Sequence, residues 1–191
     1  LARRENGETP AEYGPDGKII LSAEFMEYLA IHRILGELGL ALKLEGFIMP
    51  DELKKLYRYI PAKPEANTIG LALELLDKPW NFSKNINVPP YLKTWSKAQL
   101  DAAILRMVTI RAVLESLGVF PGDIQFFILK DGQIILGDLD HFRKITPDHY
   151  PDKTNQVITL LVRAWEKETK QKYPDEDFEE LTGQKRDDWL R

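Results

Sequence analysis

Two acidic motifs in the second half of the sequence could place a metal ion beside a reacting phosphate. Asp138 and Asp140 form Asp-Leu-Asp directly after an apolar run, and Asp123 follows Pro-Gly fifteen residues earlier. Mg²⁺ and similar hard cations bind carboxylate oxygens. Phosphoryl transfer needs such a cation together with an acid that orients the attacking hydroxyl. We therefore expect a metal-dependent phosphotransfer site if the two motifs share one cleft.

The elements around these motifs are of the kind that would bring them together. Residues 96–117 have apolar side chains at helical spacing, Ser96 is a suitable N-cap, and Gly118 is expected to end this helix. Residues 126–129 and 134–136 are short apolar runs on either side of Asp131-Gly132, which predicts a β-hairpin. A hairpin at this place would bring the chain after residue 136 back beside residue 125, so that the acids before and after the hairpin could share one edge of a cleft.

The segment from Gly122 to Asp140 resembles the catalytic segment of atypical protein kinases. It is similar to the secretory-pathway group that includes protein O-mannose kinase and vertebrate lonesome kinase, where a loop containing Asp leads into a hairpin that ends in Asp-Leu-Asp. It also resembles the aminoglycoside phosphotransferase superfamily, whose metal motif often reads Asp-Phe-Asp-His. The resemblance extends from Ser96 to Phe142.

The resemblance implies roles for four residues of this segment. Asp138 would be the principal metal ligand, and Asp140 would support the metal or its surroundings. Asp123 would be the catalytic base or the acid that orients the hydroxyl. Gln125 would stand near the place of a second, amide-type metal ligand.

The resemblance also implies cofactors and an upstream binding region. Lys18, paired with Glu24 or Glu27, would position ATP, and Glu74 would lie at a hinge near residues 74–78. The cofactors would be ATP with Mg²⁺ or Mn²⁺, and the acceptor would be a hydroxyl of a protein or a small molecule.

The fold class that follows is α+β, a minimal kinase-like fold with a reduced N-lobe and a mainly helical C-lobe. Residues 1–18 would be a linker or flexible start, residues 19–78 the N-lobe-like region, and residues 79–191 the C-lobe-like region with the catalytic hairpin at 119–142.

The pattern of apolar residues predicts strands at 19–21, 40–49 and 68–76, and a loop at 77–94. Residues 68–76 could also form a helix. Helices are predicted at 23–38 with Ser22 as N-cap, at 51–59 and 155–170, and within 173–191.

Composition narrows the function classes. The 191 residues carry a formal charge of −4 with no long basic run, so we expect no nucleic-acid partner. The absence of cysteine excludes disulfides, thiolate catalysis and cysteine zinc sites. No apolar run reaches membrane-spanning length, and we expect a cytoplasmic protein, or a secreted one that acts in a target-cell cytosol.

Other interpretations stay open at the level of sequence. Asp favours turns, so the acidic motifs also fit turn capping, and His141 and His149 could join Asp138 and Asp140 in a transition-metal site. No Gly-rich loop precedes Lys18, and Ile128 occupies the usual offset of the metal-binding Asn. A catalytically inactive kinase-like binding module is therefore the main alternative. A chain that begins with Leu also suggests an effector or toxin domain excised from a longer secreted protein.

Overall fold

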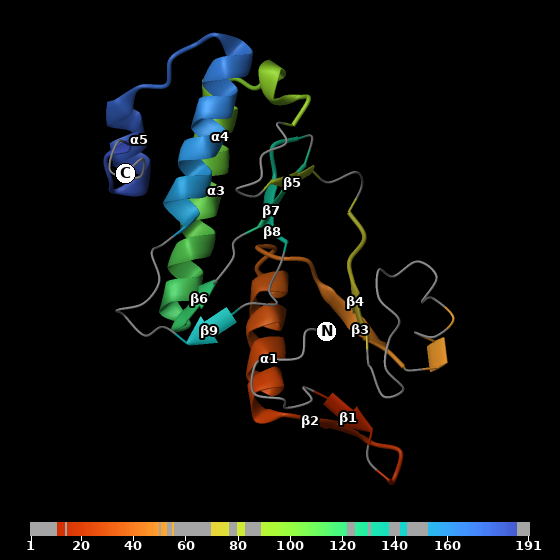
Figure 1. The fold of residues 1–191 in the computed structure, drawn as a ribbon. Coiled ribbons are helices and arrows are strands. Elements are labelled where there is room, and N and C mark those ends of the chain that lie inside the picture. The colour runs from red at the N-terminus through yellow and green to blue at the C-terminus, as the bar shows by residue number, and fades with distance from the viewer. Residues whose placement is uncertain are drawn as a thin grey trace. The chain divides into compact units, whose positions relative to one another are not determined.

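The computed structural model describes residues 11–13, 15–49, 51–52, 55, 70–76, 80–82, 89–121, 125–129, 131–137, 142–144 and 153–186. The chain forms two compact units, Leu1–Leu75 and Leu76–Arg191. Both units combine helices with small antiparallel sheets, which confirms the mixed α+β class (Figure 1). The identification of these units with kinase lobes stays a prediction.

The first unit begins with a hairpin that leads into a helix. Strand β1 (Ala11–Tyr13) pairs with β2 (Ile19–Leu21), and the intervening turn has Gly17 at φ +77°. Helix α1 (Ala23–Glu37) starts where the Ser22 hydroxyl accepts a hydrogen bond from the Phe25 N–H. Strand β2 and helix α1 confirm the sequence prediction, whereas the strand at 11–13 corrects the expected linker.

A two-stranded sheet follows in the first unit and lies near α1. Strand β3 (Leu44–Ile48) pairs with β4 (Gly70–Leu73), and both lie within the predicted strands. His32 of α1 is buried, and its Nε2 lies 2.7 Å from the Leu42 carbonyl oxygen. This contact holds the chain that enters β3 against the helix.

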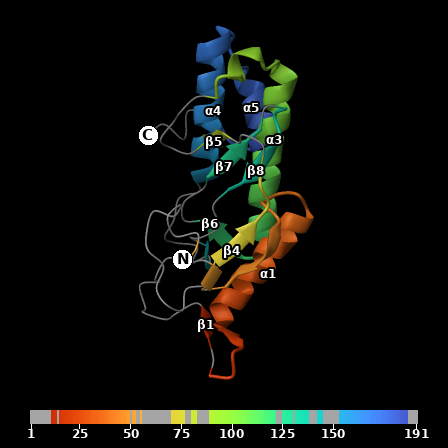
Figure 2. The same cartoon turned by 90° about the vertical axis from the view of Figure 1, so that its right-hand side faces the viewer.

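Three helices form the frame of the second unit. They are α3 (Lys97–Ser116), α4 (Lys153–Thr169) and α5 (Asp175–Thr182), and Figures 1 and 2 both show α3 and α4 side by side. Ser96 and Gln99 form a reciprocal capping box at the start of α3, and Gly118 follows the helix at φ +67°. All three helices fall where the sequence predicted them.

Helix α4 is buried on most of its sides. Its enclosed side chains are Thr154, Asn155, Val157, Ile158, Thr159, Leu161, Val162, Ala164 and Trp165. The Trp165 indole N–H donates to the Trp95 carbonyl at 2.9 Å, which joins α4 to the chain that follows the 3₁₀ helix η2 (Leu92–Thr94). Burial on so many sides makes α4 the central support of this unit.

The described strands of the second unit form two small sheets. One has the order β5 (Trp80–Phe82), β7 (Phe126–Ile128), β8 (Ile134–Leu136), and the other pairs β6 (Val119–Pro121) with β9 (Phe142–Lys144). The predicted hairpin is confirmed as β7–β8. Strand β5 corrects the expected loop at 77–94, because its three residues gain a ladder on β7 that the sequence does not reveal.

Candidate functional site

The β7–β8 hairpin is the element that would position the predicted catalytic acids. Its register pairs Phe126 with Leu136 and Ile128 with Ile134, and all four side chains are fully buried. At the turn, the Gln133 N–H donates to the Asp131 Oδ1 at 3.0 Å, and Gly132 adopts φ +89°. A buried ladder and a turn with a left-handed glycine fix this register against slippage.

The open end of the hairpin lies opposite that turn. There the Gly137 N–H donates to the Gln125 carbonyl at 2.9 Å, which extends the ladder by one further bond. Gly137 also lies under an aromatic ring, because a Cβ built on it would be 2.8 Å from Cε2 of Phe127. The backbone that leads out of β8 is therefore held by a hydrogen bond and by close packing.

The predicted catalytic and metal-binding residues fall mostly outside the described residues. Asp123, Asp138 and Asp140 lie there, as do His141 and His149 of the alternative metal site. Gln125 is described, with a half-buried side chain at the start of β7. Within the part of the chain that the structure describes, no group of three or more His, Asp or Glu side chains could hold a metal ion.

The predicted nucleotide-binding residues lie in the first unit. The Lys18 ammonium forms an ion pair with Asp16 at 3.1 Å, and the Lys18 side chain is 82% exposed. Glu27 is an exposed residue of α1, and the side chain of Glu24 lies outside the described set. The expected pairing of Lys18 with Glu24 or Glu27 stays a prediction. The ion pair with Asp16 joins Lys18 to the turn between β1 and β2.

Glu74 continues the β3–β4 ladder. Its backbone N–H donates to the Lys43 carbonyl at 2.9 Å, and its carboxylate accepts from the Lys43 N–H at 3.2 Å. A role at a nucleotide-binding hinge stays a prediction. The two hydrogen bonds to Lys43 give this carboxylate a fixed place beside the strand pair.

Aromatic side chains connect the hairpin to the helical frame of its unit. The Tyr91 hydroxyl donates to the Ile128 carbonyl at 2.6 Å, and the Tyr91 ring stacks on Trp95. Burial, followed by the negative charge of Asp131, raises the pKa of Tyr91 to about 12. The hairpin is therefore fixed to the segment that carries η2, which in turn is bonded to α4.

An ionic cluster joins α3 to α5, and sequence reasoning did not find it. The Lys97 ammonium lies 2.8 Å from a carboxylate oxygen of Asp101 and 2.7 Å from one of Asp177. The Tyr173 hydroxyl donates to the other oxygen of Asp101 at 2.6 Å, and burial is the first cause that raises the Tyr173 pKa above its ordinary value. The spacing of Lys97 and Asp101 is a readable helix pair, but the other partners meet only in the folded chain.

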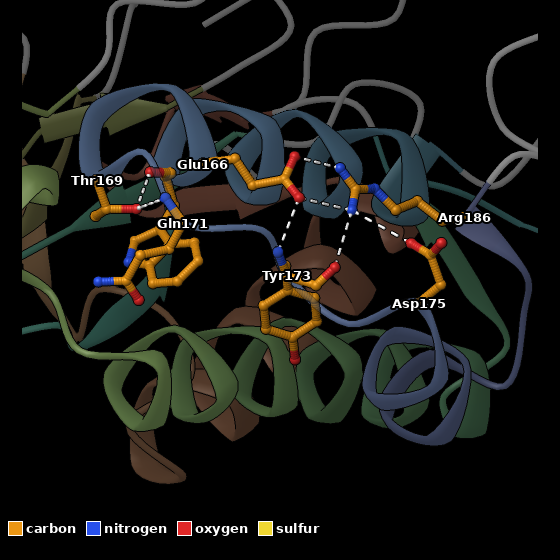
Figure 3. A network of polar contacts seen from close by, with 7 residues as sticks. Glu166, Thr169, Gln171, Tyr173, Asp175 and Arg186 are labelled. Atoms are coloured by element: carbon orange, nitrogen blue, oxygen red, sulfur yellow. Dashed lines mark hydrogen bonds and ion pairs between the residues drawn. The ribbon is translucent and has the colours of Figure 1, made fainter.

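A second polar network lies where α4 ends and α5 begins (Figure 3). The Arg186 guanidinium makes two hydrogen bonds to the Glu166 carboxylate, at 2.9 and 2.5 Å, and lies 3.4 Å from Asp175. The Tyr173 N–H donates to Glu166 at 2.9 Å. Burial acts to raise the pKa of Glu166, but these hydrogen bonds and the Arg186 charge outweigh it and lower the pKa. The network fastens Arg186, which lies four residues beyond the end of α5, to the central helix.

No family model, curated protein or solved structure matches the chain. Within the described residues, no helix combines the length and the apolar character needed to cross a membrane. The candidate site therefore has to be judged on its residues and geometry.

Proposed function

We propose that this chain is a kinase-like phosphotransferase that uses ATP with Mg²⁺ or Mn²⁺ and modifies a hydroxyl of a protein or small molecule. One observation carries the proposal: the β7–β8 hairpin brings the Gln125 carbonyl and the Gly137 N–H together at its open end, 2.9 Å apart. Gln125 is two residues after Asp123, and Gly137 directly precedes Asp138. Because consecutive Cα atoms are about 3.8 Å apart, we expect both acids to lie near this one end.

The proposed roles follow from the chemistry of phosphoryl transfer. Asp123 would accept the proton of the acceptor hydroxyl, whose oxygen would bond to the γ-phosphorus of ATP while the bond to the β–γ bridging oxygen breaks and ADP leaves. Asp138, with Gln125 and Asp140, would hold the divalent cation. The bound cation would offset negative charge on the phosphates.

The rigid surroundings of the hairpin support this proposal physically. The long helix α3 precedes it, the Tyr91 hydroxyl bonds to Ile128, and four buried apolar side chains lock its register. Phosphoryl transfer depends chiefly on positioning and on fixed charges, so acids that extend from such a support would be well placed.

A second candidate is a kinase-like binding module without catalysis. The observation that favours it is the Lys18–Asp16 ion pair, because a lysine that positions phosphates would be expected to pair with a glutamate of the following helix. In this case the hairpin would be part of a recognition surface.

Nucleotide binding and turnover test the first proposal. We expect ATP with Mg²⁺ or Mn²⁺ to raise the melting temperature, with a smaller rise in EDTA, and we expect ADP release with a suitable acceptor. Asp138→Asn should remove the metal-dependent rise and reduce transfer by about 100-fold or more, because several kcal/mol of charge stabilisation would be lost.

Asp131→Asn is the matched control for this experiment. It removes one negative charge from the opposite, turn end of the same hairpin and keeps an oxygen that can accept the Gln133 N–H. We expect its nucleotide binding to equal that of the unmodified chain. Equal behaviour of the two variants, or a melting temperature that ATP and metal leave unchanged, would count against phosphotransfer and favour the binding module.

A further inference from the structure

A hollow with an excess of positive charge lies where α4 ends, on the helical side of the second unit. It has a volume of about 510 Å³ and is lined by Arg163, Glu166, Lys170, Gln171, Lys172, Asp175 and Arg186. Four of these side chains are cationic and two are carboxylates, whereas the chain as a whole has a charge of −4. The local excess of positive charge is opposite in sign to the charge of the whole chain.

Helical geometry explains why these charges lie together. Arg163 and Glu166 are spaced at i and i+3, so α4 presents them on one face, and Lys170 follows directly after the last residue of the helix. Lys172 follows two residues after Lys170, and Arg186 reaches the same place by binding Glu166. The hollow is thus formed by one face of α4, by the segment between α4 and α5, by the first residue of α5, and by Arg186 after α5.

The two carboxylates of the hollow are both turned to Arg186. Glu166 holds the Arg186 guanidinium through two hydrogen bonds, and Asp175 lies 3.4 Å from the same group. Among the described residues, Arg163, Lys170 and Lys172 are not part of these two ion pairs, and all three side chains are exposed. Lys172 also acts on Glu166 through its charge, which helps to lower the Glu166 pKa. An incoming anion would meet these three exposed cations at the hollow, which Gln171 also lines.

The backbone at Lys170 supports a role for its side chain. Among the described residues, Lys170 is the one non-glycine residue with a positive φ, at 61°, and its N–H donates to the Glu166 carbonyl to end α4. Glycine suits this left-handed position best, and a residue with a Cβ costs roughly 1–2 kcal/mol there. A lysine held at this cost to stability is consistent with a side chain that is needed at the hollow.

We propose that this hollow binds a compact small molecule that carries phosphate groups. The hollow is open to solvent and lined by charged and polar side chains, which suits a charged, water-soluble ligand. Several cations close together match the multiple negative charge of phosphate groups better than they match the single charge of one carboxylate. A long polyanion such as a nucleic acid is disfavoured, because the adjoining α5 carries the acidic residues Asp175, Glu176, Asp177, Glu179 and Glu180. The proposal is independent of the phosphotransfer site.

Titration with inorganic pyrophosphate in EDTA tests this proposal on the full chain. EDTA removes divalent cations, so a metal-dependent nucleotide site does not contribute. We expect the backbone amide resonances of Lys170, Gln171 and Lys172 to shift with one common dissociation constant. Sodium chloride at matched ionic strength should leave these resonances in place, and citrate should bind more weakly.

The variant Lys170→Gly distinguishes an effect on ligand binding from an effect on protein stability. Glycine fits the left-handed backbone, so we expect a higher melting temperature together with an affinity for pyrophosphate that is lower by about fivefold. Lys170→Gln should weaken binding to a similar degree, and the matched control Lys167→Gln, an exposed change on the same helix outside the lining, should preserve the affinity.

Three results would overturn the proposal. The first is an absence of shifts at these amides. The second is equal weakening by Lys167→Gln and Lys170→Gln. The third is citrate binding as tight as that of pyrophosphate, which would show that the hollow has no preference for phosphate.

Discussion

Substitution of Gly137 by alanine should destabilise the open end of the β7–β8 hairpin. A Cβ at this position would lie 2.8, 3.0 and 3.2 Å from Cε2, Cδ2 and Cζ of the Phe127 ring, where ordinary contacts begin at 3.4 Å. The ring must therefore retreat by several tenths of an ångström. Phe127 is half-buried, so it can move in part toward solvent.

The expected magnitude follows from two opposing terms. Overpacking in a core costs about 1–3 kcal/mol, and the partial freedom of Phe127 places this site in the lower half of that range. Alanine also restricts the unfolded chain, which stabilises by about 0.4–1 kcal/mol where the backbone is compatible. We expect Gly137→Ala to lower the free energy of unfolding by roughly 1 kcal/mol.

A double-mutant cycle with Phe127→Leu measures whether the ring is the cause. Unfolding in urea can be followed by tryptophan fluorescence, because Trp80, Trp95, Trp165 and Trp189 all belong to the second unit. In the Phe127→Leu background, Gly137→Ala should cost little, which gives a coupling energy of about 1 kcal/mol.

The control for the intrinsic effect of the substitution is Gly46→Ala. Gly46 lies in β3 of the first unit, and a Cβ there would have nothing within 4 Å, so far-UV circular dichroism should show no loss of stability. If Gly137→Ala costs the same in the unmodified chain and in the Phe127→Leu background, the packing explanation is refuted.

Two further predictions concern groups with shifted pKa values. Glu166 has a lowered pKa in the folded chain, so its network stabilises fully above the ordinary glutamate pKa of 4.5 and loses this contribution as pH falls through the lower, folded value. Glu166→Gln should therefore lower the free energy of unfolding by about 2 kcal/mol near pH 7 and by less in acid. Urea titrations at several pH values measure this difference. An equal loss of stability at pH 7 and in acid would contradict an ionic origin. Tyr91, with a pKa near 12, should ionise after tyrosines of ordinary pKa in an ultraviolet titration, and its stabilising effect should be lost as pH rises from 10 through 12. If Tyr91→Phe removes signal near pH 10 instead of near pH 12, this assignment is rejected.

The hairpin links the predictions about stability to the proposed chemistry. Gly137 directly precedes Asp138, and its N–H closes the last ladder bond to Gln125. Strain that the Phe127 ring does not relieve by moving would shift the backbone just before the proposed metal ligand. If the phosphotransfer proposal is correct, Gly137→Ala should reduce transfer, and Phe127→Leu should restore part of it.

The sequence by itself determined the elements whose signals are local. Ser22 and Ser96 begin helices because a hydroxyl can satisfy free backbone N–H groups, and Gly118 follows α3 because glycine tolerates a positive φ. The Asp131-Gly132 turn predicted the hairpin for the same reason. The order of helix, loop, hairpin and acidic residue could therefore be predicted from the sequence alone.

Tertiary structure alone decided the partners that come from distant parts of the chain. Strands β5, β6 and β9 are each three residues long, too short for a periodic signal, and they exist because a ladder partner is present. The ion pair of Arg186 with Glu166 and the hollow beside it depend on the chain after α4, which places α5 against α3 and returns Arg186 to Glu166. Spacing along the chain shows which side chains share one helix face, but it does not show which charges of other segments come to rest against that face.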